Sequence, residues 1–148
     1  MRKIIGNRRG FTLTELMIAV VIIGVLAVLA IGRFSAVATS AKQAEVKGIL
    51  KQIYVLERAY LQEYEGYWPS DGSTITADSS LANRDNFNML SLSVEIMATA
   101  RYSYALTGNP TTFTVVATAT GLDDDATQDI WQIDQTGSLV CLSDDVRN

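Results

Sequence analysis

Histidine is absent from the 148 residues, and cysteine occurs once, at Cys141. Without histidine the chain lacks the commonest general base and the commonest metal ligand. It also contains no nucleophile motif and no glycine-rich phosphate loop. A single cysteine cannot form a disulfide within the chain, and in the apolar run 138–142 a small buried hydrophobic side chain is the simplest interpretation of Cys141. These absences argue against an enzyme, and no cofactor is expected.

Positive charge is scarce beyond the first ten residues. Of the 12 Lys and Arg side chains, four lie in residues 2–9, which leaves eight against all 16 acidic side chains and a net charge of −8 for the rest of the chain. Clustered Lys and Arg supply the electrostatic part of nucleic-acid binding, so we expect no direct nucleic-acid contact. An acidic balance of this kind suits an exterior that faces water.

One long apolar stretch runs from Phe11 to Gly32 and holds a single charged side chain, Glu15. Its 22 residues would form a helix of about 33 Å, which is long enough to cross the hydrocarbon core of a membrane. Because flanking Lys and Arg stay on the cytoplasmic side, residues 2–9 would orient this helix with the rest of the chain facing outward.

Glu15 is the anomaly of this stretch. A carboxylate inside a membrane helix costs about 2.5 to 3.5 kcal/mol on insertion scales, so it indicates a functional role and a cationic partner. Near the start of a helix, a carboxylate already complements the dipole and the unpaired N–H groups of the first turn. Both interpretations can hold together.

The run Gly10-Phe11-Thr12-Leu13-Thr14-Glu15 resembles the processing site of type IV prepilins and pseudopilins. The resemblance implies that a membrane-embedded prepilin peptidase cuts after Gly10 and methylates the new amine of Phe11, giving N-methylphenylalanine. It further implies that the retained helix forms a filament core in which Glu15 of one subunit neutralises the Phe11 amine of the next. That amine would be positively charged at neutral pH.

Two glycines complete the positions that the resemblance assigns to assembly, Gly24 and Gly32. Family members often have Pro where this chain has Gly32, and that Pro helps a short segment lose its helical hydrogen bonds in the filament. Each Gly weakens a helix by about 0.8 to 1 kcal/mol relative to Ala. The segment from Gly24 to Gly32 could therefore unwind on assembly.

The resemblance implies a structural subunit, most simply the major pilin of a type IV pilus that supports adhesion, surface motility or DNA uptake. Its partners would be identical pilins in a homopolymer, prepilin peptidase, the inner-membrane assembly machinery and, before assembly, membrane lipid. The subunit would reside in the inner membrane first and then in the extracellular pilus. A pseudopilin of a type II secretion system or a minor pilin would share the pattern of residues 10–32, so both remain alternatives.

An ordinary signal peptide is a more distant alternative, because residues 36–38 (Ala-Val-Ala) fit the small-x-small cleavage rule. Cleavage there would release a soluble binding domain of 110 residues that begins at Thr39. Against this, the apolar region of such a peptide runs only about 7 to 15 residues and would not normally contain Glu. A mature N-terminus at Phe11 or at Thr39 distinguishes the two.

After Arg33 the apolar pattern narrows to one face of a helix. The stripe comprises Val46, Ile49, Leu50, Ile53, Leu56, Tyr60, Leu61, Tyr64 and Tyr67, with Lys47, Lys51, Arg58 and Glu65 opposite. We expect one helix from Phe11 to about Tyr67, ended by Gly66 and the Trp68-Pro69 pair. Glu57 intrudes near the stripe without a local explanation.

The remaining residues predict a small antiparallel sheet. Residues 69–92 read as a long surface loop with a helical turn near 86–90, and four strands follow at 101–106, 112–118, 129–133 and 138–142. The stripe on the helix is the available cover for the sheet. The predicted fold class is therefore α+β, a long helical spine with a hydrophobic first half packed on a sheet of about four strands, as in pilins. The domains would be a leader at 1–10, a transmembrane and filament-core helix at 11–34, and a globular region at 35–148.

An acidic cluster in the last quarter of the chain is a weak calcium candidate. Asp123, Asp125, Thr127, Asp129 and Asp134 occupy positions 1, 3, 5, 7 and 12 of an EF-hand-like spacing. The match fails where the motif wants Gly in the turn and a bidentate Glu at its end. A solvated acidic turn is the better interpretation, and no metal is expected.

Overall fold

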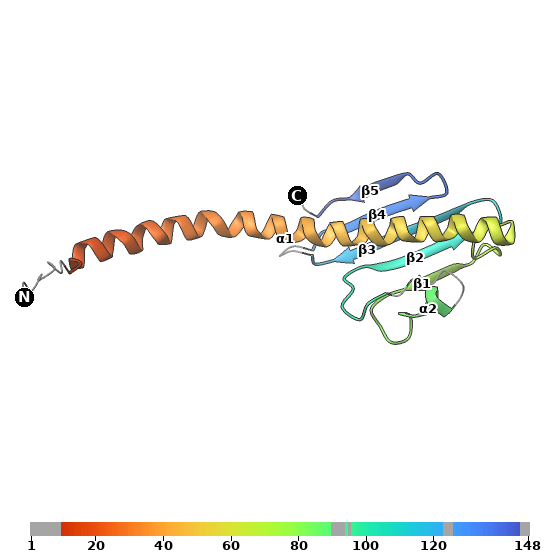
Figure 1. Ribbon diagram of the computed structural model, residues 1–148, viewed down its shortest axis with the longest axis horizontal. Helices are drawn as coiled ribbons and strands as arrows, with labels where there is room; N and C mark the ends of the chain where they lie inside the picture. Colours follow the sequence, from red (N-terminus) through yellow and green to blue (C-terminus); the bar gives the residue numbers. More distant parts are fainter. Residues whose placement is uncertain (1–9, 90–93, 95, 123–125, 146–148) are drawn as a thin grey trace, which may run out of the picture. The chain divides into compact units, whose positions relative to one another are not determined.

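The computed structural model describes residues 10–89, 94, 96–122 and 126–145, and at residues 31–36 and 89 it describes the backbone alone. Within these residues the elements follow in the order α1 (Leu13–Tyr64), β1 (Thr74–Ala77), α2 (Asn86–Met89), β2 (Ser103–Gly108), β3 (Phe113–Thr120), β4 (Gln128–Asp134) and β5 (Leu139–Ser143) (Figure 1). The chain divides into two compact units, Met1–Ala36 and Val37–Asn148, and α1 contributes residues to both.

The 52-residue helix α1 is the helix that the apolar pattern predicts, with slightly different ends. It begins at Leu13 rather than Phe11 and stops at Tyr64 rather than near Tyr67. It stops there because Glu65 has a positive φ of 59°, the left-handed conformation that ends many helices. The buried residues 66–69 then lead the chain away from the helix, so the predicted stop signals lie just beyond its last turn.

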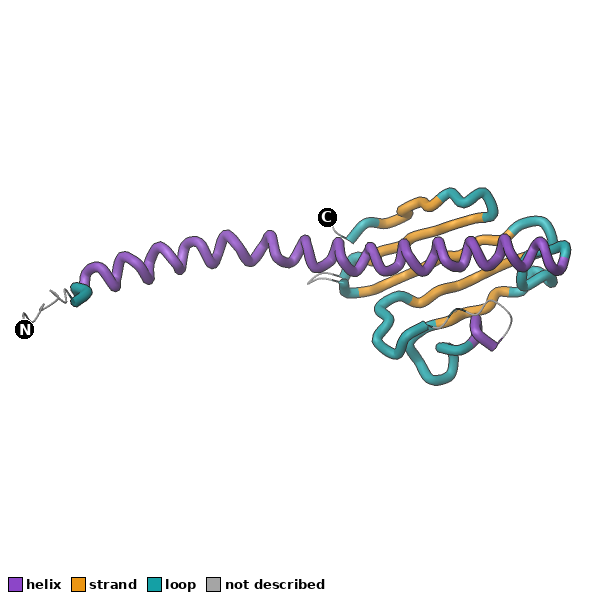
Figure 2. The backbone as a smooth tube through the Cα atoms, in the orientation of Figure 1, coloured by secondary structure: helices purple, strands orange, loops and turns teal. Residues whose placement is uncertain are grey.

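The five strands form one antiparallel sheet in the order β1-β2-β3-β4-β5, so that each strand pairs with its neighbour in sequence (Figure 2). Apolar residues of neighbouring strands are aligned across the sheet, with Leu106 of β2 opposite Val115 of β3 and Val115 opposite Ile133 of β4. Strands β2 to β5 match the four predicted strands to within two residues at each end. The short helix α2 lies where a helical turn was expected.

Strand β1 was not predicted, because residues 69–92 read as a loop. It has only four residues, Thr74–Ala77, and it forms one edge of the sheet by pairing with β2. Four residues are too few for a clear alternation, and what makes them a strand is the ladder to β2, with Ile75 opposite Leu106. The sheet therefore has five strands rather than about four.

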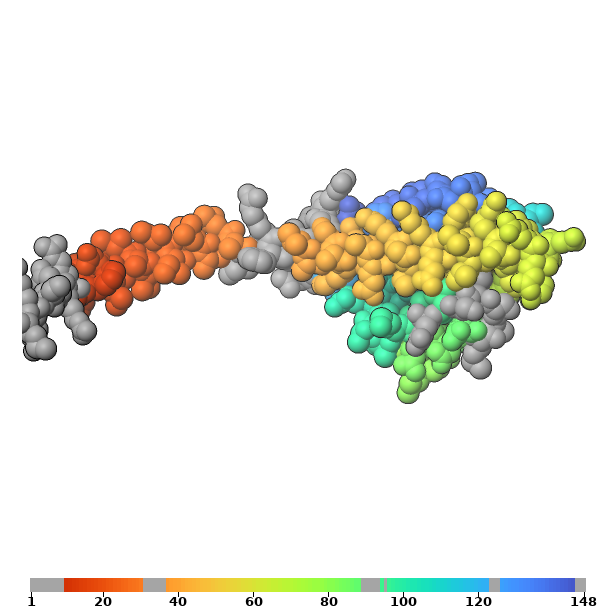
Figure 3. Space-filling view, viewed as in Figure 1, coloured from red at the N-terminus to blue at the C-terminus, as the bar shows by residue number. Residues whose placement is uncertain are grey.

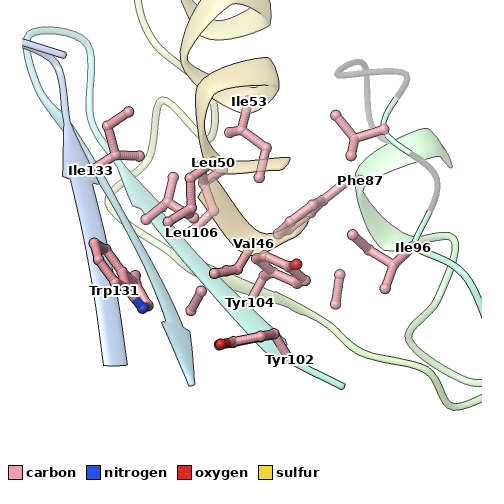
Figure 4. Packing of buried hydrophobic residues seen from close by; sticks show 14 of the residues in the cluster. Val46, Leu50, Ile53, Phe87, Ile96, Tyr102, Tyr104, Leu106, Trp131 and Ile133 are labelled. Atoms are coloured by element: carbon pink, nitrogen blue, oxygen red, sulfur yellow. The ribbon is translucent and has the colours of Figure 1, made fainter. Parts of the chain in front are cut away.

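Residues 37–64 of α1 lie over one face of this sheet (Figures 1 and 3). Val46, Leu50 and Ile53 are fully buried in a core that includes Leu106 and Ile133 of the sheet (Figure 4). Burial of each such side chain stabilises the folded state by about 1.5 to 3 kcal/mol. The helix and the sheet are thus held together by the predicted stripe.

The stripe prediction was wrong at two positions. Tyr64 is 58% exposed and its ring stacks 4.4 Å from that of Tyr60, because residues 66–69 rather than the last turn of α1 cover this end of the core. Lys47, predicted to face away from the core, is only half-exposed. Its ammonium lies 4.2 Å from the ring centroid of Trp131, a cation–π contact that draws it towards the sheet.

Candidate functional site

The predicted processing residues lie directly before and within the first turn of α1. Gly10, Phe11 and Thr12 form an irregular segment, and the Phe11 side chain is 85% exposed. The carboxylate oxygen Oε2 of Glu15 accepts hydrogen bonds from the N–H and the hydroxyl of Thr12, each at 2.8 Å. The Glu15 N–H in turn donates to the Thr12 hydroxyl oxygen at 3.2 Å.

These reciprocal bonds form a capping box, in which Thr12 is the N-cap and Glu15 is the third helical residue. Replacing such an N-cap typically costs about 0.5 to 2 kcal/mol. Glu15 is therefore a helix-start residue in the uncut chain, and its other oxygen, Oε1, has no hydrogen bond to the residues that the structure describes. Thr12 was missed as a site residue, although the spacing Thr-x-x-Glu before an apolar run is a known sign of this box.

The glycine assigned to cleavage, Gly10, precedes α1, and the two assigned to assembly, Gly24 and Gly32, lie within it. A Cβ built on Gly10 or Gly24 would meet nothing within 4 Å. Gly24 and Gly32 both belong to α1, and the backbone between them is helical. Nothing in the described fold of the single chain therefore demands glycine at Gly10 or Gly24.

The surface of this part of α1 is apolar on all sides. Leu13–Ala30 is the one helical stretch of the described residues that is long and apolar enough to cross a membrane, and none of it is buried. Large side chains from Leu16 to Leu29 are more than half exposed. An apolar surface of this extent signals an interaction site, either with lipid or with other apolar helices.

The structure describes only part of the acidic cluster. Asp123 and Asp125 lie outside the described residues, so the calcium candidate stays a prediction. The alternative interpretation, a solvated acidic turn, is wrong at Asp129, which is fully buried at the start of β4. Among the described residues no group of three or more His, Cys, Asp or Glu side chains could hold a metal ion.

Asp129 is instead the acceptor of a buried hydrogen-bond network. Its Oδ2 accepts from the Tyr102 hydroxyl at 2.5 Å and from the Trp131 indole N–H at 2.7 Å. Its Oδ1 accepts from the Gln43 amide of α1 at 2.8 Å and from the Asp145 backbone N–H at 3.3 Å. The carboxylate thus links α1, the sheet and the segment after β5, and it satisfies the rule that buried polar groups are paired.

Comparison with known proteins identifies the N-terminal feature. Residues 5–31 match the family model described as the prokaryotic N-terminal methylation motif. Over 61 residues the chain is 46% identical to a protein named type IV major pilin protein PilA from Myxococcus xanthus. This stretch covers 41% of the chain and only 28% of that relative. No solved structure matches the chain.

The motif match covers the capping box and most of the apolar surface of α1, and the fold is a helix on an antiparallel sheet. The chain carries the prokaryotic N-terminal methylation motif at residues 5–31, and over 61 residues it is similar to a type IV major pilin.

Proposed function

We propose that this protein is a structural subunit, the major pilin, of a type IV pilus and that it has no enzymatic role of its own. The observation that carries the proposal is the unburied apolar helix Leu13–Ala30, which lies within the methylation motif at residues 5–31. A filament of identical subunits would cover that surface, and membrane lipid would cover it before assembly. The similarity to a protein named as a major pilin supports this role over that of a minor pilin or a pseudopilin.

In this proposal a prepilin peptidase cuts between Gly10 and Phe11 and methylates the Phe11 amine. Residues 1–10 are then the leader, residues 11–34 the membrane and filament-core helix, and residues 35–148 the globular region. The exposed Phe11 and the irregular backbone before α1 support a cut at this point, because a protease needs an extended and accessible segment. The basic residues 2–9 would keep the leader cytoplasmic.

Glu15 then has a second role after processing. Its Oε2 is held by Thr12, while Oε1 is left for a partner outside the described chain. The new amine of Phe11 on a neighbouring subunit is a cation of the right kind. Pairing of the two charges offsets the cost of placing each of them among apolar side chains.

Assembly would take the subunit from the inner membrane to the extracellular pilus with the help of inner-membrane assembly machinery. The helical segment between Gly24 and Gly32 could unwind in the filament, because each glycine weakens the helix. The net charge of −8 beyond Gly10 suits a water-facing filament exterior and opposes direct nucleic-acid binding. Any part in DNA uptake would then run through other proteins.

Filaments sheared from cells test the proposal. We expect this chain to be their dominant protein, with a mass that begins at a methylated Phe11. Cryo-electron microscopy should place residues 11–34 in the filament core. A chain that is processed at Phe11 but is scarce in sheared filaments would be a minor pilin or a pseudopilin, and a mature N-terminus at Thr39 would overturn the assignment altogether.

A further inference from the structure

Glu57 is the charged residue that intrudes near the predicted stripe without a local explanation, and it lies fully buried on α1. It continues the buried row formed by Val46, Leu50 and Ile53 at spacings of three and four residues, the spacing of one helix face. A carboxyl group in such a core is costly unless it is neutral or well paired.

The pairing of Glu57 is incomplete. Its Oε2 accepts a hydrogen bond from the Trp68 backbone N–H at 3.0 Å. Its Oε1 is also buried, but it has no hydrogen-bond partner among the described residues. One oxygen therefore fixes the turn after the helix, while the other meets no donor.

Among the described residues, no ion pair involves Glu57. On α1 the titratable side chains one turn away are Tyr54 and Tyr60, and the neighbouring Arg58 is exposed. The turn contributes Tyr67, whose ring packs 4.9 Å from that of Phe113 on β3. The described ion pairs of the chain involve other carboxylates, those of Glu45 and Asp85.

The turn that Glu57 fixes is closely packed. The Trp68 ring meets the ring of Phe87 on α2 edge to face, with centroids 6.2 Å apart. On β2, a Cβ at Gly108 would come within 2.6 Å of the Trp68 carbonyl oxygen, so only glycine fits there. Trp68 and Pro69 also line an open pocket of about 390 Å³ beside Tyr60 and Asp71.

We infer that Glu57 and the turn 66–69 form a proton-dependent latch: neutral Glu57 holds the turn in the core, and ionised Glu57 loosens the turn and the pocket that it lines. The charged carboxylate with one unpaired oxygen can regain water only if the turn moves, because the residues around it supply no further donor. The latch is a property of the globular unit and does not depend on filament assembly.

The direction of the pH effect follows from the position of the carboxyl. Burial raises the pKa of Glu57 from its ordinary 4.5 to about 7, and the hydrogen bond from Trp68 opposes that rise only in part. Below about pH 4.5 the folded and unfolded chains are both protonated at Glu57, so its contribution to stability is fully present. Between about 4.5 and 7 only the unfolded chain loses the proton, and the unfolding constant should rise about tenfold per pH unit before levelling off.

Denaturant unfolding of the full-length protein in detergent micelles tests the latch. Both tryptophans, Trp68 and Trp131, belong to the unit Val37–Asn148, so their fluorescence reports on its unfolding. We expect the unfolding constant of the wild type to rise between pH 5 and 7, and that of Glu57→Gln to lose this rise. Glu63→Gln, which changes an exposed carboxylate on the same helix, is the matched control and should keep it.

Two further measurements separate the latch from a general loss of packing. In the wild type, NMR of ¹³C-labelled glutamate carboxyls should show one group that titrates near pH 7, a result that needs no variant to fold. Hydrogen exchange at residues 66–68 should be faster in the wild type than in Glu57→Gln at pH 8 and equal in the two at pH 5. A glutamate set that titrates wholly near 4.5, or exchange that matches at both pH values, would overturn the inference.

Discussion

At the scale of single residues, Gly10 stands in a position where the fold makes no demand for glycine. A Cβ there would meet nothing within 4 Å, and the same holds for Gly48 in the exposed part of α1. The difference between them is their place in the motif, since only Gly10 lies at the proposed cleavage point. Recognition by the peptidase is therefore the reason we assign to Gly10.

Gly10→Val should leave the full-length precursor in the inner membrane, because a branched side chain crowds the backbone where it enters the protease cleft. Gly48→Ala is the control and should be processed normally, with a gain of about 1 kcal/mol in helix stability. Mass spectrometry of membrane fractions reads out both variants. A Gly10→Val protein of normal mature mass would contradict the assignment.

The capping box allows the two roles of Glu15 to be separated. A capping box accepts Gln in place of Glu, so Glu15→Gln keeps the helix start and removes only the charge. Thr12→Ala does the reverse, because it removes the N-cap and keeps the carboxylate. We expect Glu15→Gln to be inserted and processed but to give few filaments, and Thr12→Ala to assemble despite a loss of about 0.5 to 2 kcal/mol in helix stability.

Electron microscopy of surface filaments and blots for mature protein measure both outcomes. Wild-type filament numbers in Glu15→Gln cells would contradict the proposed ion pair between subunits and would leave Glu15 only its role in capping the first turn of α1. Loss of filaments in Thr12→Ala cells alone would assign assembly to the cap rather than to the charge.

What the sequence could reveal at this scale depended on distance along the chain. Gly10, Phe11 and Glu15 lie within six residues, so a local motif is enough to predict their roles. Asp129 is bonded by Tyr102, 27 residues away, and by Gln43, 86 residues away. No local pattern joins those donors to the acceptor, which is why a buried carboxylate was taken for a solvated one.

At the scale of the elements, the periodicity of apolar residues was enough to predict a helix or strand wherever that element was long or alternated clearly. Strand β3 alternates buried and half-buried side chains over nearly its whole length, and it was predicted. Strand β1 is a four-residue edge strand that depends on its pairing with the distant strand β2, and it was not predicted. The observed ends of α1 differ from the predicted ones because the capping residues decide where a helix begins and ends. These are Thr12 at the start and Glu65 at the end.

The stripe on α1 rather than covalent closure should hold the sheet in place, since Cys141 is the only cysteine. Ile53→Ala should lower the free energy of unfolding by about 2 to 5 kcal/mol, as for other buried aliphatic truncations. Cys141→Ala should cost much less, because the thiol is only half-buried and its one described hydrogen bond, to the Ser143 carbonyl, comes from a weak S–H donor.

Tryptophan fluorescence during denaturant titration of the full-length protein in micelles gives both values. Equal losses for the two variants would mean that the stripe is misassigned or that Cys141 has a role of its own.

At the scale of the whole molecule, the ionisable groups give the globular unit a stability profile with several steps. Hydrogen bonds from Ser73, Ser80 and Thr136 lower the pKa of the carboxyls of Asp71, Asp78 and Asp134 below their ordinary 3.8. Their contributions are present above that value and are lost as the pH falls further. With Glu57 acting between about 4.5 and 7, stability should be greatest between about pH 4 and 5 and roughly level from 7 to 9, above which the raised pKa of the Cys141 thiol also lowers it.

Above pH 10, two buried tyrosines lower the stability of the globular unit as they ionise on unfolding. Burial, followed by the hydrogen bond to Asp129 and its negative charge, raises the pKa of Tyr102 above its ordinary 10. Burial, followed by the charge of Glu45, raises that of Tyr104. Because both values are raised on folding, their contributions are complete below pH 10 and are lost as the pH rises above it, by up to about 1.4 kcal/mol per pH unit for each tyrosine.

Tyr102→Phe tests this end of the profile together with the Asp129 network. At pH 7 the free energy of unfolding of the variant should be about 1 to 3 kcal/mol lower than that of the wild type, because one of the four donors to a buried carboxylate is gone. Above pH 10 it should lose stability less steeply than the wild type, since one fewer tyrosine has to ionise on unfolding. The two curves, measured by denaturant titration from pH 7 to 11.5, should therefore approach each other as the pH rises. Parallel curves would show that the Tyr102 hydroxyl ionises as easily in the folded chain as in the unfolded one, and that Asp129 does not hold it.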